Sequence, residues 1–287
     1  MSKKLEYTRL PDFRISYSES KIDQTSSIYH HHDAFEIALF INADLQIFIK
    51  DYEYKIRNWD LFFINEYDIH HIMYNTTPNY IRYVIHFKRD YVLPVLKALN
   101  MEGILDNLAS AENKKTHPNL KDRAEILALF EAIHRATGYG HEPCDEISRA
   151  QVLSNLILLL IKLMKLLQFE ENSKVLTESD IFIQGVIRHI DENFMKPITL
   201  TGLSISLYTN KYYLCHLFKQ KTGFTVMEYI QYRRVIEAQK LLKETDKDII
   251  TVYYECGFNN VQNFYRVFKK ISKVTPLQYR KLYREEN

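Results

Sequence analysis

The side chains best suited to chemistry gather near the N-terminus, where His30, His31 and His32 stand together and Glu36 follows. Another histidine, His70, comes later in the chain. Imidazole nitrogens combined with one carboxylate suit divalent iron, manganese, nickel or zinc. The same side chains can instead line a metal-free pocket, hydrogen-bonding one another and a small polar effector. In a strand, His31 points to the opposite face from its two neighbours, which leaves the assignment among the three histidines ambiguous.

Short strands, predicted between residues 13 and 87, must position these residues. The runs are rich in β-branched and aromatic residues, and their close spacing is typical of a small antiparallel barrel or sandwich. They cover residues 35–40, 45–49, 52–56, 61–64 and 80–87. A barrel fits best, and we expect its effector pocket to be lined by His30, His32, Glu36, His70 and Tyr83.

The spacing His-x-His-x3-Glu, followed by a later histidine, resembles the motifs of cupin barrels. In cupin enzymes the equivalents of four residues bind a divalent metal, namely those of His30, His32, Glu36 and His70. Enzyme cupins also carry flanking glycines at three positions where this chain has Ala43, Asn58 and Asp68. We therefore interpret the barrel as a metal-free sensor without catalytic residues or a cofactor. A metal-dependent cupin enzyme is the alternative.

The second half of the chain contains an internal repeat at an offset of 50 residues, which aligns Phe218 with Phe268. Each copy predicts a short helix, a tight connection and a second helix with one apolar face. Asn210 and Asn259 occupy the expected N-cap positions of the two second helices. Two such helices joined by a turn form a helix-turn-helix, whose second helix enters the major groove of DNA. The repeat therefore predicts a tandem DNA-binding domain.

Several runs within residues 199–284 are similar to the signature of AraC-type transcription regulators. They include Leu217-Phe218-Lys219, Thr222-Gly223-Phe224, Leu241-Leu242, Gly257-Phe258 and Thr275-Pro276. Such regulators often carry a cupin-like barrel in front of the DNA-binding domain, and the resemblance implies an activator that works with RNA polymerase. The chain departs from the family pattern at two small residues and two glycines, which are replaced by Ser204, Tyr253, Tyr208 and Lys273. We expect these changes to affect the packing of the helices near the turns.

The two second helices carry the candidate DNA contacts. By resemblance, the base-reading residues are Tyr212, Cys215, His216, Val261, Gln262 and Arg266. Arginine can bond the O6 and N7 atoms of guanine, glutamine can pair with adenine, and valine or tyrosine can contact a thymine methyl group. We expect phosphate contacts, which position the domain without reading sequence, from Lys211, Lys219, Asn260, Lys269 and Lys270.

Between the barrel and the repeat, apolar residues recur at intervals of three and four and predict helices over residues 91–168. The last of these helices carries two neighbouring apolar stripes, which is wider than one packing surface requires. We predict a homodimer through this helix, and the alternative is complete burial within one chain. The predicted dimer contacts are Leu153, Leu156, Leu160, Leu163 and Leu167.

Charge and cysteine usage fit this division. Residues 1–179 carry 21 Lys and Arg against 25 Asp and Glu, whereas residues 180–287 carry 17 against 11. The basic half contains the repeat, as phosphate binding requires. The three cysteines lack the close spacing of a metal or disulfide pair, which favours a reducing cytoplasm. The longest apolar run, residues 156–167, contains two lysines and is too short to span a membrane.

The sequence thus predicts an α+β multidomain protein. A cupin-like barrel is expected over residues 1–90, a helical dimerisation segment over 91–168, a hinge over 169–180, and an AraC-type DNA-binding domain over 181–287. We interpret the chain as a cytoplasmic, effector-responsive regulator that binds double-stranded promoter DNA and senses a small molecule such as a sugar.

Overall fold

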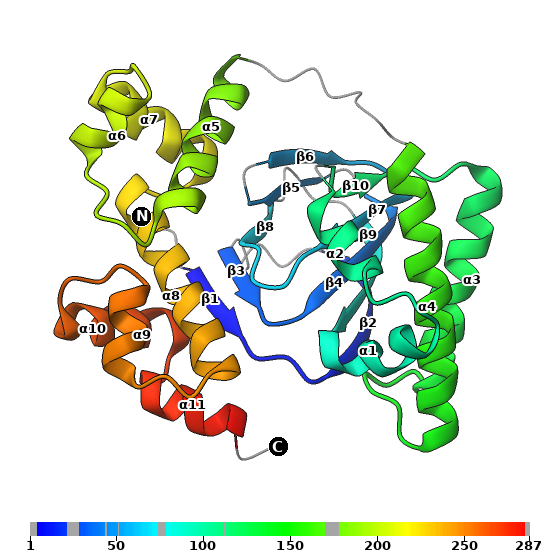
Figure 1. The fold of residues 1–287 in the computed structure, drawn as a ribbon. Helices are drawn as coiled ribbons and strands as arrows, with labels where there is room; N and C mark the ends of the chain where they lie inside the picture. Colours follow the sequence, from blue (N-terminus) through cyan, green and yellow to red (C-terminus); the bar gives the residue numbers. More distant parts are fainter. Residues whose placement is uncertain are drawn as a thin grey trace. The chain divides into compact units, whose positions relative to one another are not determined.

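The computed structural model describes residues 5–21, 29–43, 45–50, 52–73, 79–111, 113–169 and 178–284. The chain divides into two compact units, Thr8–Lys174 and Met1–Tyr7 with Val175–Asn287. Most of the predicted hinge at 169–180 lies outside the described residues. The first unit is rich in strands and the second is helical, which confirms the predicted fold class (Figure 1).

Two sheets form the framework of the first unit, one with the order β3-β8-β5-β6 and the other with the order β10-β7-β4-β9-β2. The described strands of the chain are β1 (Leu5–Thr8), β2 (Phe13–Lys21), β3 (Tyr29–His32), β4 (Phe35–Asn42), β5 (Leu45–Ile49), β6 (Tyr52–Ile56), β7 (Asp60–Ile64), β8 (His70–Met73), β9 (Asn79–Phe87) and β10 (Lys115–Thr116). The five predicted runs correspond to β4, β5, β6, β7 and β9. The sequence pattern does not predict β3 and β8, because each is four residues long and half or more of its side chains are histidines.

Side chains alternate across the second sheet and divide the first unit into two cores. Ala38, Phe40 and Val84 face the first sheet and pack with its apolar residues inside the barrel. Leu39 and Ile85 point the other way and pack against helices. Both faces of β4 are therefore buried, which explains why it is a nearly continuous apolar run.

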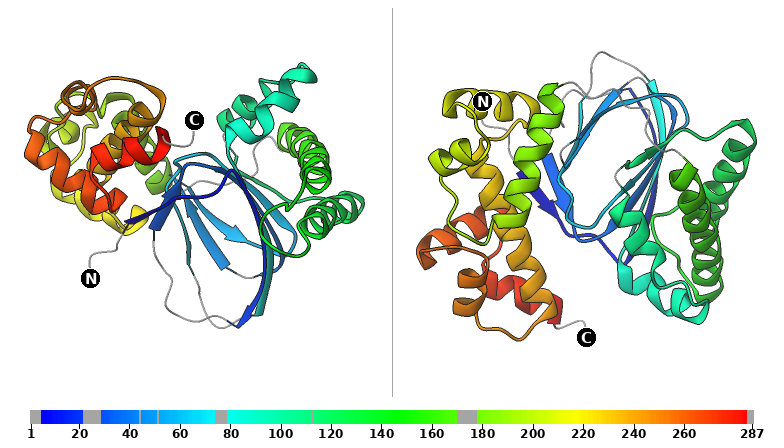
Figure 2. Two further views of the ribbon diagram at one scale, coloured as in Figure 1. Left: turned by 90° about the horizontal axis from the view of Figure 1, so that it is seen from below. Right: turned by 45° about the horizontal axis from the view of Figure 1, so that its top comes forward.

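Four helices follow or cover the second sheet: α1 (Arg89–Ala98), α2 (Ile104–Ser110), α3 (Leu120–Ala136) and α4 (Glu146–Phe169). Figures 1 and 2 show α3 and α4 lying beside each other against that sheet. Pairing with a sheet on one side and with α3 on another requires α4 to bury a wide apolar surface. This is the physical origin of its two apolar stripes.

The burial of α4 corrects the prediction of its dimer contacts. Leu156, Leu160 and Leu163 are completely buried in the core that α4 shares with the sheet, so they cannot contact a second copy. Leu153 and Leu167 are partly buried against the same core. By length and composition, Glu146–Leu167 could also cross a membrane, with a third of it buried in the protein. Its fully buried leucines instead suit a helix that packs on a sheet.

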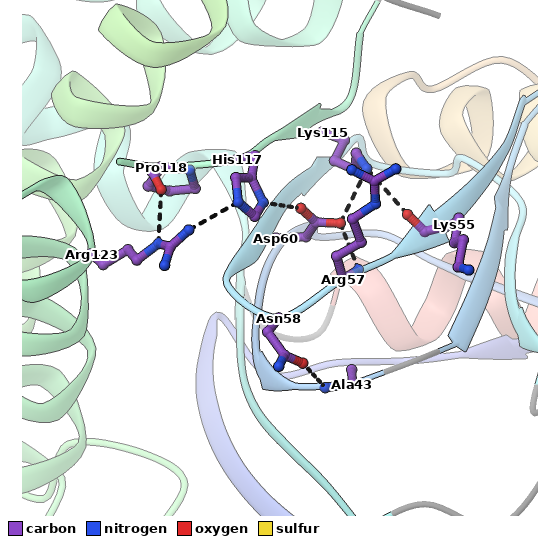
Figure 3. A network of polar contacts seen from close by, with 9 residues as sticks. All are labelled: Ala43, Lys55, Arg57, Asn58, Asp60, Lys115, His117, Pro118 and Arg123. Carbon is purple, nitrogen blue, oxygen red and sulfur yellow. Dashed lines mark hydrogen bonds and ion pairs between the residues drawn. The ribbon is translucent and has the colours of Figure 1, made fainter. Parts of the chain in front are cut away.

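A buried carboxylate ties the start of α3 to the barrel (Figure 3). Asp60 is fully buried and accepts hydrogen bonds from Arg57 N at 2.7 Å, Lys115 Nζ at 3.1 Å and His117 Nδ1 at 2.8 Å. The other nitrogen of His117 lies 2.9 Å from the Arg123 guanidinium on α3. Because a buried charge needs such partners, this network fixes β10 and α3 relative to β7.

The second unit consists of α5 (Glu178–Asn193), α6 (Leu200–Ser206), α7 (Lys211–Thr222), α8 (Val226–Glu244), α9 (Ile249–Glu255), α10 (Val261–Ser272) and α11 (Pro276–Arg284). The pairs α6/α7 and α9/α10 are the two predicted helix-turn-helix motifs, and α8 joins them (Figure 1). Asn210 caps α7, as predicted. The prediction of Asn259 as the second cap is wrong, because α10 begins at Val261 and its N-terminal amides are capped by Asn260.

The turns keep their geometry where the family's glycines are missing. Tyr208 after α6 and Lys273 after α10 both adopt the left-handed backbone conformation, with φ of 49° and 64°. A side chain there costs about 1–3 kcal/mol relative to a relaxed backbone. Tyr208 is almost fully exposed, so its ring meets no packing conflict. Tyr253 lies against Phe264, with ring centroids 6.1 Å apart.

Candidate functional site

The second helix of each pair divides into a buried face and an outward face. The apolar faces are fully or almost fully buried and consist of Leu214, Leu217 and Phe218 on α7 and Phe264, Val267 and Phe268 on α10. The outward faces carry the predicted base-reading residues: Tyr212, His216, Gln262 and Arg266 are exposed, and Cys215 and Val261 are partly exposed. The four predicted phosphate-binding lysines, Lys211, Lys219, Lys269 and Lys270, are also exposed. Both helices therefore present polar and basic groups to a ligand outside the protein.

The exposed face of α10 is internally ordered. Asn260 Oδ1 accepts a hydrogen bond from the Asn263 amide at 2.9 Å, and the Arg266 guanidinium donates to Asn263 Oδ1 at 2.8 Å. The cap thus occupies the side-chain oxygen of Asn260, a predicted phosphate contact. Asn263, one turn before Arg266, restricts the direction of the guanidinium. A pre-oriented side chain loses less entropy when it binds a base.

The arginine pair on α8 has a structural role. Arg233 Nε donates to Asp191 on α5 at 2.7 Å. Arg234 donates to two backbone carbonyls after α5, those of Phe194 at 2.7 Å and Lys196 at 2.9 Å. These contacts occupy both guanidinium groups within the unit and hold α8 against α5 and the segment that follows it.

A second cluster of functional side chains lies inside the barrel, and Glu36 is at its centre. Glu36 Oε2 lies 3.1 Å from His32 Nε2, 3.4 Å from His70 Nε2 and 3.0 Å from His86 Nε2. The four residues come from β3, β4, β8 and β9. His30 joins them, with its ring centroid 4.1 Å from that of His70. The structure therefore brings together His30, His32, Glu36 and His70, as the sequence grouped them.

His86 was not identified from the sequence, although it completes the cluster. It lies directly opposite Glu36 in the pairing of β4 with β9. It also shares the inward face of β9 with Val84. The only sequence signal was this alternation within β9.

Tyr83 does not belong to the cluster, which corrects its grouping with the effector pocket. It lies on the other face of β9 and packs against Tyr17 and Phe130, with ring centroids 4.9 Å and 5.7 Å away. The reason is strand alternation, which directs Tyr83 and His86 to opposite sides of the sheet.

Burial and hydrogen bonding set the charges of the cluster. Burial lowers the pKa of His32 to about 4, although its contact with Glu36 acts in the opposite direction. Burial alone would raise the pKa of Glu36, but its close contacts with His32, His70 and His86 outweigh it and hold that pKa well below its ordinary value. Burial likewise lowers the pKa of His70, yet the Glu36 carboxylate and the Asp68 carbonyl leave it raised. The cluster is thus built around an ionised, buried carboxylate.

Two overlapping sets of donor atoms are close enough to share a metal ion. One set is His30, His32 and His70, and the other is His32, Glu36 and His86; within each, the donor atoms lie within 4.8 Å of one another. Imidazole and carboxylate donors of this kind fit a transition-metal ion as well as a polar effector.

Comparisons with known proteins cover both units. An AraC-like ligand binding domain matches residues 13–160, and a helix-turn-helix domain matches residues 203–282. The transcriptional activator RhaS of Enterobacter sp. (strain 638) is 23% identical over 266 residues, or 91% of this chain and 90% of its own length. The transcriptional activator RhaR of Escherichia coli O139:H28 is 24% identical over 254 residues, or 88% and 86% of the two lengths.

A solved structure of apo ToxT from Vibrio cholerae aligns with 96% of this chain and 99% of its own, at 15% identity and a TM-score of 0.42. The ligand-binding match spans more than half of the chain, and the helix-turn-helix match follows it in the second unit. The chain therefore belongs to the AraC family of transcription regulators.

Proposed function

We propose that this protein is an effector-responsive transcription activator that reads promoter DNA with α7 and α10 and binds a small molecule in its barrel. One observation carries the proposal: both second helices bury matched apolar faces and expose the predicted base-reading residues. A helix with such an outward face suits the major groove, which admits one α-helix and displays a distinct pattern for each base pair.

The two helices have different chemistry. On α10, Arg266 can fork onto guanine and Gln262 can pair with adenine, whereas Val261 can contact a thymine methyl group. On α7, Tyr212 and His216 offer one ring each. We expect α10 to distinguish base pairs by hydrogen bonds, and α7 to distinguish them mainly by contacts with thymine methyl groups and by the shape of the groove.

The remaining parts of the proposal rest on the family. RhaS and RhaR are activators, so we propose activation through RNA polymerase in the cytoplasm, with a sugar as the first candidate effector. We propose that two copies bind together. Because the buried leucines of α4 cannot contact a second copy, its contacts would come from exposed apolar residues of the same helix, Ile147 and Leu158.

A gel-shift titration on the DNA upstream of the protein's own gene and its neighbours tests the proposal. The wild-type chain is compared with Gln262→Ala and His216→Ala, which remove exposed side chains from α10 and α7. Lys240→Ala is the matched control, because Lys240 is an exposed residue of α8 and belongs to neither α7 nor α10. We expect the reader variants to lose affinity for one specific fragment and the control to retain it. A chain that shifts no fragment, or shifts all fragments equally, contradicts the proposal.

The barrel cluster also favours a second candidate, a metal-dependent cupin enzyme joined to a DNA-binding domain. An enzyme converts its ligand, whereas a sensor releases it unchanged. Small molecules that raise the melting temperature are incubated with the protein and recovered for mass spectrometry. Conversion that is lost in Glu36→Gln supports the enzyme, and quantitative recovery supports the sensor.

A further inference from the structure

The turns inside the two helix-turn-helix pairs have the same backbone geometry. Tyr208 is the second residue after α6, and Gly257 is the second residue after α9. Tyr208 N donates to the Ile205 carbonyl at 3.1 Å, and Gly257 N donates to the Tyr254 carbonyl at 2.9 Å. Both residues adopt the left-handed backbone conformation, with φ of 49° and 80°. This turn therefore requires a conformation that glycine adopts without strain and tyrosine does not.

The two turns differ in what a side chain meets there. A Cβ atom on Gly257 would lie 2.5 Å from the Met195 carbonyl oxygen, so the second turn has no room for a side chain. The Tyr208 side chain is instead 99% exposed. Within the described part of the chain it makes no hydrogen bond, ion pair or ring contact. Tyr208 thus carries backbone strain, and its ring gives the folded chain no contact that offsets it.

Its place in the chain puts the Tyr208 side chain at the DNA-reading end of α7. Asn210, two residues further on, caps the first amides of α7. Tyr212, in the first turn of that helix, is 84% exposed. In a helix-turn-helix the N-terminal residues of the second helix contact base edges, and the first helix crosses the sugar–phosphate backbone. A side chain in the turn between the two helices therefore lies beside the wall of the major groove.

We propose that Tyr208 contacts DNA, with its phenolic hydroxyl donating a hydrogen bond to a phosphate oxygen at the edge of the groove that α7 enters. This contact deepens the proposed function, on which it rests, by adding a residue of the turn to those of the two second helices. Tyrosine is one of the side chains that bond phosphates in protein–DNA complexes. Strained residues cluster where a ligand uses the side chain, and an exposed Tyr208 fits that pattern.

The contact has a signature that separates it from the lysine contacts. A phenol is uncharged, so it positions α7 on the backbone without releasing a counterion, whereas each lysine on a phosphate releases one. Loss of the Tyr208 hydroxyl should therefore weaken binding equally at every salt concentration. It should also weaken binding to all sequences, because a phosphate contact reads no base.

Gel-shift titrations of the full-length chain at several salt concentrations measure both properties, on the fragment that the wild-type chain shifts and on random DNA. Tyr208→Phe removes only the hydroxyl. We expect affinity for both fragments to fall about tenfold, the effect of one lost hydrogen bond to a charged group. The slope of log affinity against log salt should keep its wild-type value. Lys211→Ala should instead reduce that slope by about one unit.

Tyr208→Gly separates binding from stability. The melting temperature of the second unit should rise, because relief of the left-handed strain outweighs the extra freedom of glycine in the unfolded chain. DNA affinity should nevertheless fall as in Tyr208→Phe, a result that a purely structural residue would not give. Tyr139→Phe is the matched control, since Tyr139 is a 69% exposed tyrosine of the other unit with a φ of 61°. It should leave DNA affinity unchanged.

Ethylation of individual phosphates on the specific fragment identifies the partner of Tyr208. One ethylated phosphate that weakens wild-type binding should have no further effect in Tyr208→Phe, and an interference pattern identical to that of the wild type overturns the contact. Wild-type affinity in Tyr208→Phe also overturns it, including when reporter activation falls, which would place Tyr208 at a protein partner. A wild-type chain that shifts no fragment overturns the proposed function as well, so the two failures are distinguishable.

Discussion

Adding one methyl group at Gly257 tests how the second helix-turn-helix pair is held within its unit. Gly257 lies between α9 and α10 with a φ of 80°. A Cβ atom there would lie 2.5 Å from the carbonyl oxygen of Met195 and 2.8 Å from that of Phe194. These are backbone atoms, and Arg234 holds the same segment by hydrogen bonds to Phe194 and Lys196. The segment cannot move aside without losing those bonds.

The expected effect of Gly257→Ala has two parts. The left-handed backbone costs alanine about 1 kcal/mol or more, and overpacking against fixed neighbours adds about 1–3 kcal/mol. The free energy of unfolding of this unit should therefore fall by about 2–4 kcal/mol in total. Because α10 follows the turn directly, specific DNA affinity should fall as well.

Chemical denaturation, monitored by circular dichroism, measures the loss in the free energy of unfolding. Gly138→Ala is the matched control, since Gly138 also has a positive φ, 62°, but a Cβ there would meet nothing within 4 Å. In Gly138→Ala, the unfolding transition of the first unit should show only the cost of the left-handed backbone, about 1 kcal/mol or more. A loss in Gly257→Ala no larger than in Gly138→Ala would refute the close approach to Met195.

Three further changes probe the DNA-binding unit. Arg266→Ala should reduce affinity for the specific fragment by about 1–3 kcal/mol and relax one base preference in a binding-site selection, and an equal loss on random DNA would argue against base reading. Lys269→Ala should weaken binding to all fragments and reduce the slope of log affinity against log salt by about one unit, whereas an unchanged slope would place Lys269 away from phosphate. Lys273→Gly should raise the free energy of unfolding by about 1 kcal/mol, because glycine relieves the left-handed strain at φ 64°, and a decrease would contradict this account.

The DNA-binding unit could largely be predicted because its determinants are local. The apolar faces of α7 and α10 recur at helical spacing, and the repeat at an offset of 50 residues reveals two copies of one unit. The single misplaced cap, Asn259 for Asn260, reflects how weakly sequence fixes the ends of helices. The turn residues that replace glycine, such as Lys273, adopt the left-handed backbone all the same.

The barrel site depends on contacts between distant segments. His86 and Glu36 are 50 residues apart and meet because β4 and β9 pair in one register. The leucines of α4 form a repeating pattern, but only packing against the sheet decided that Leu156 and Leu160 are internal. Short-range periodicity determined the helices, five of the ten described strands and the outward faces of α7 and α10. Strand register and helix packing, which no local pattern encodes, decided which histidines surround Glu36 and which side of β9 Tyr83 occupies.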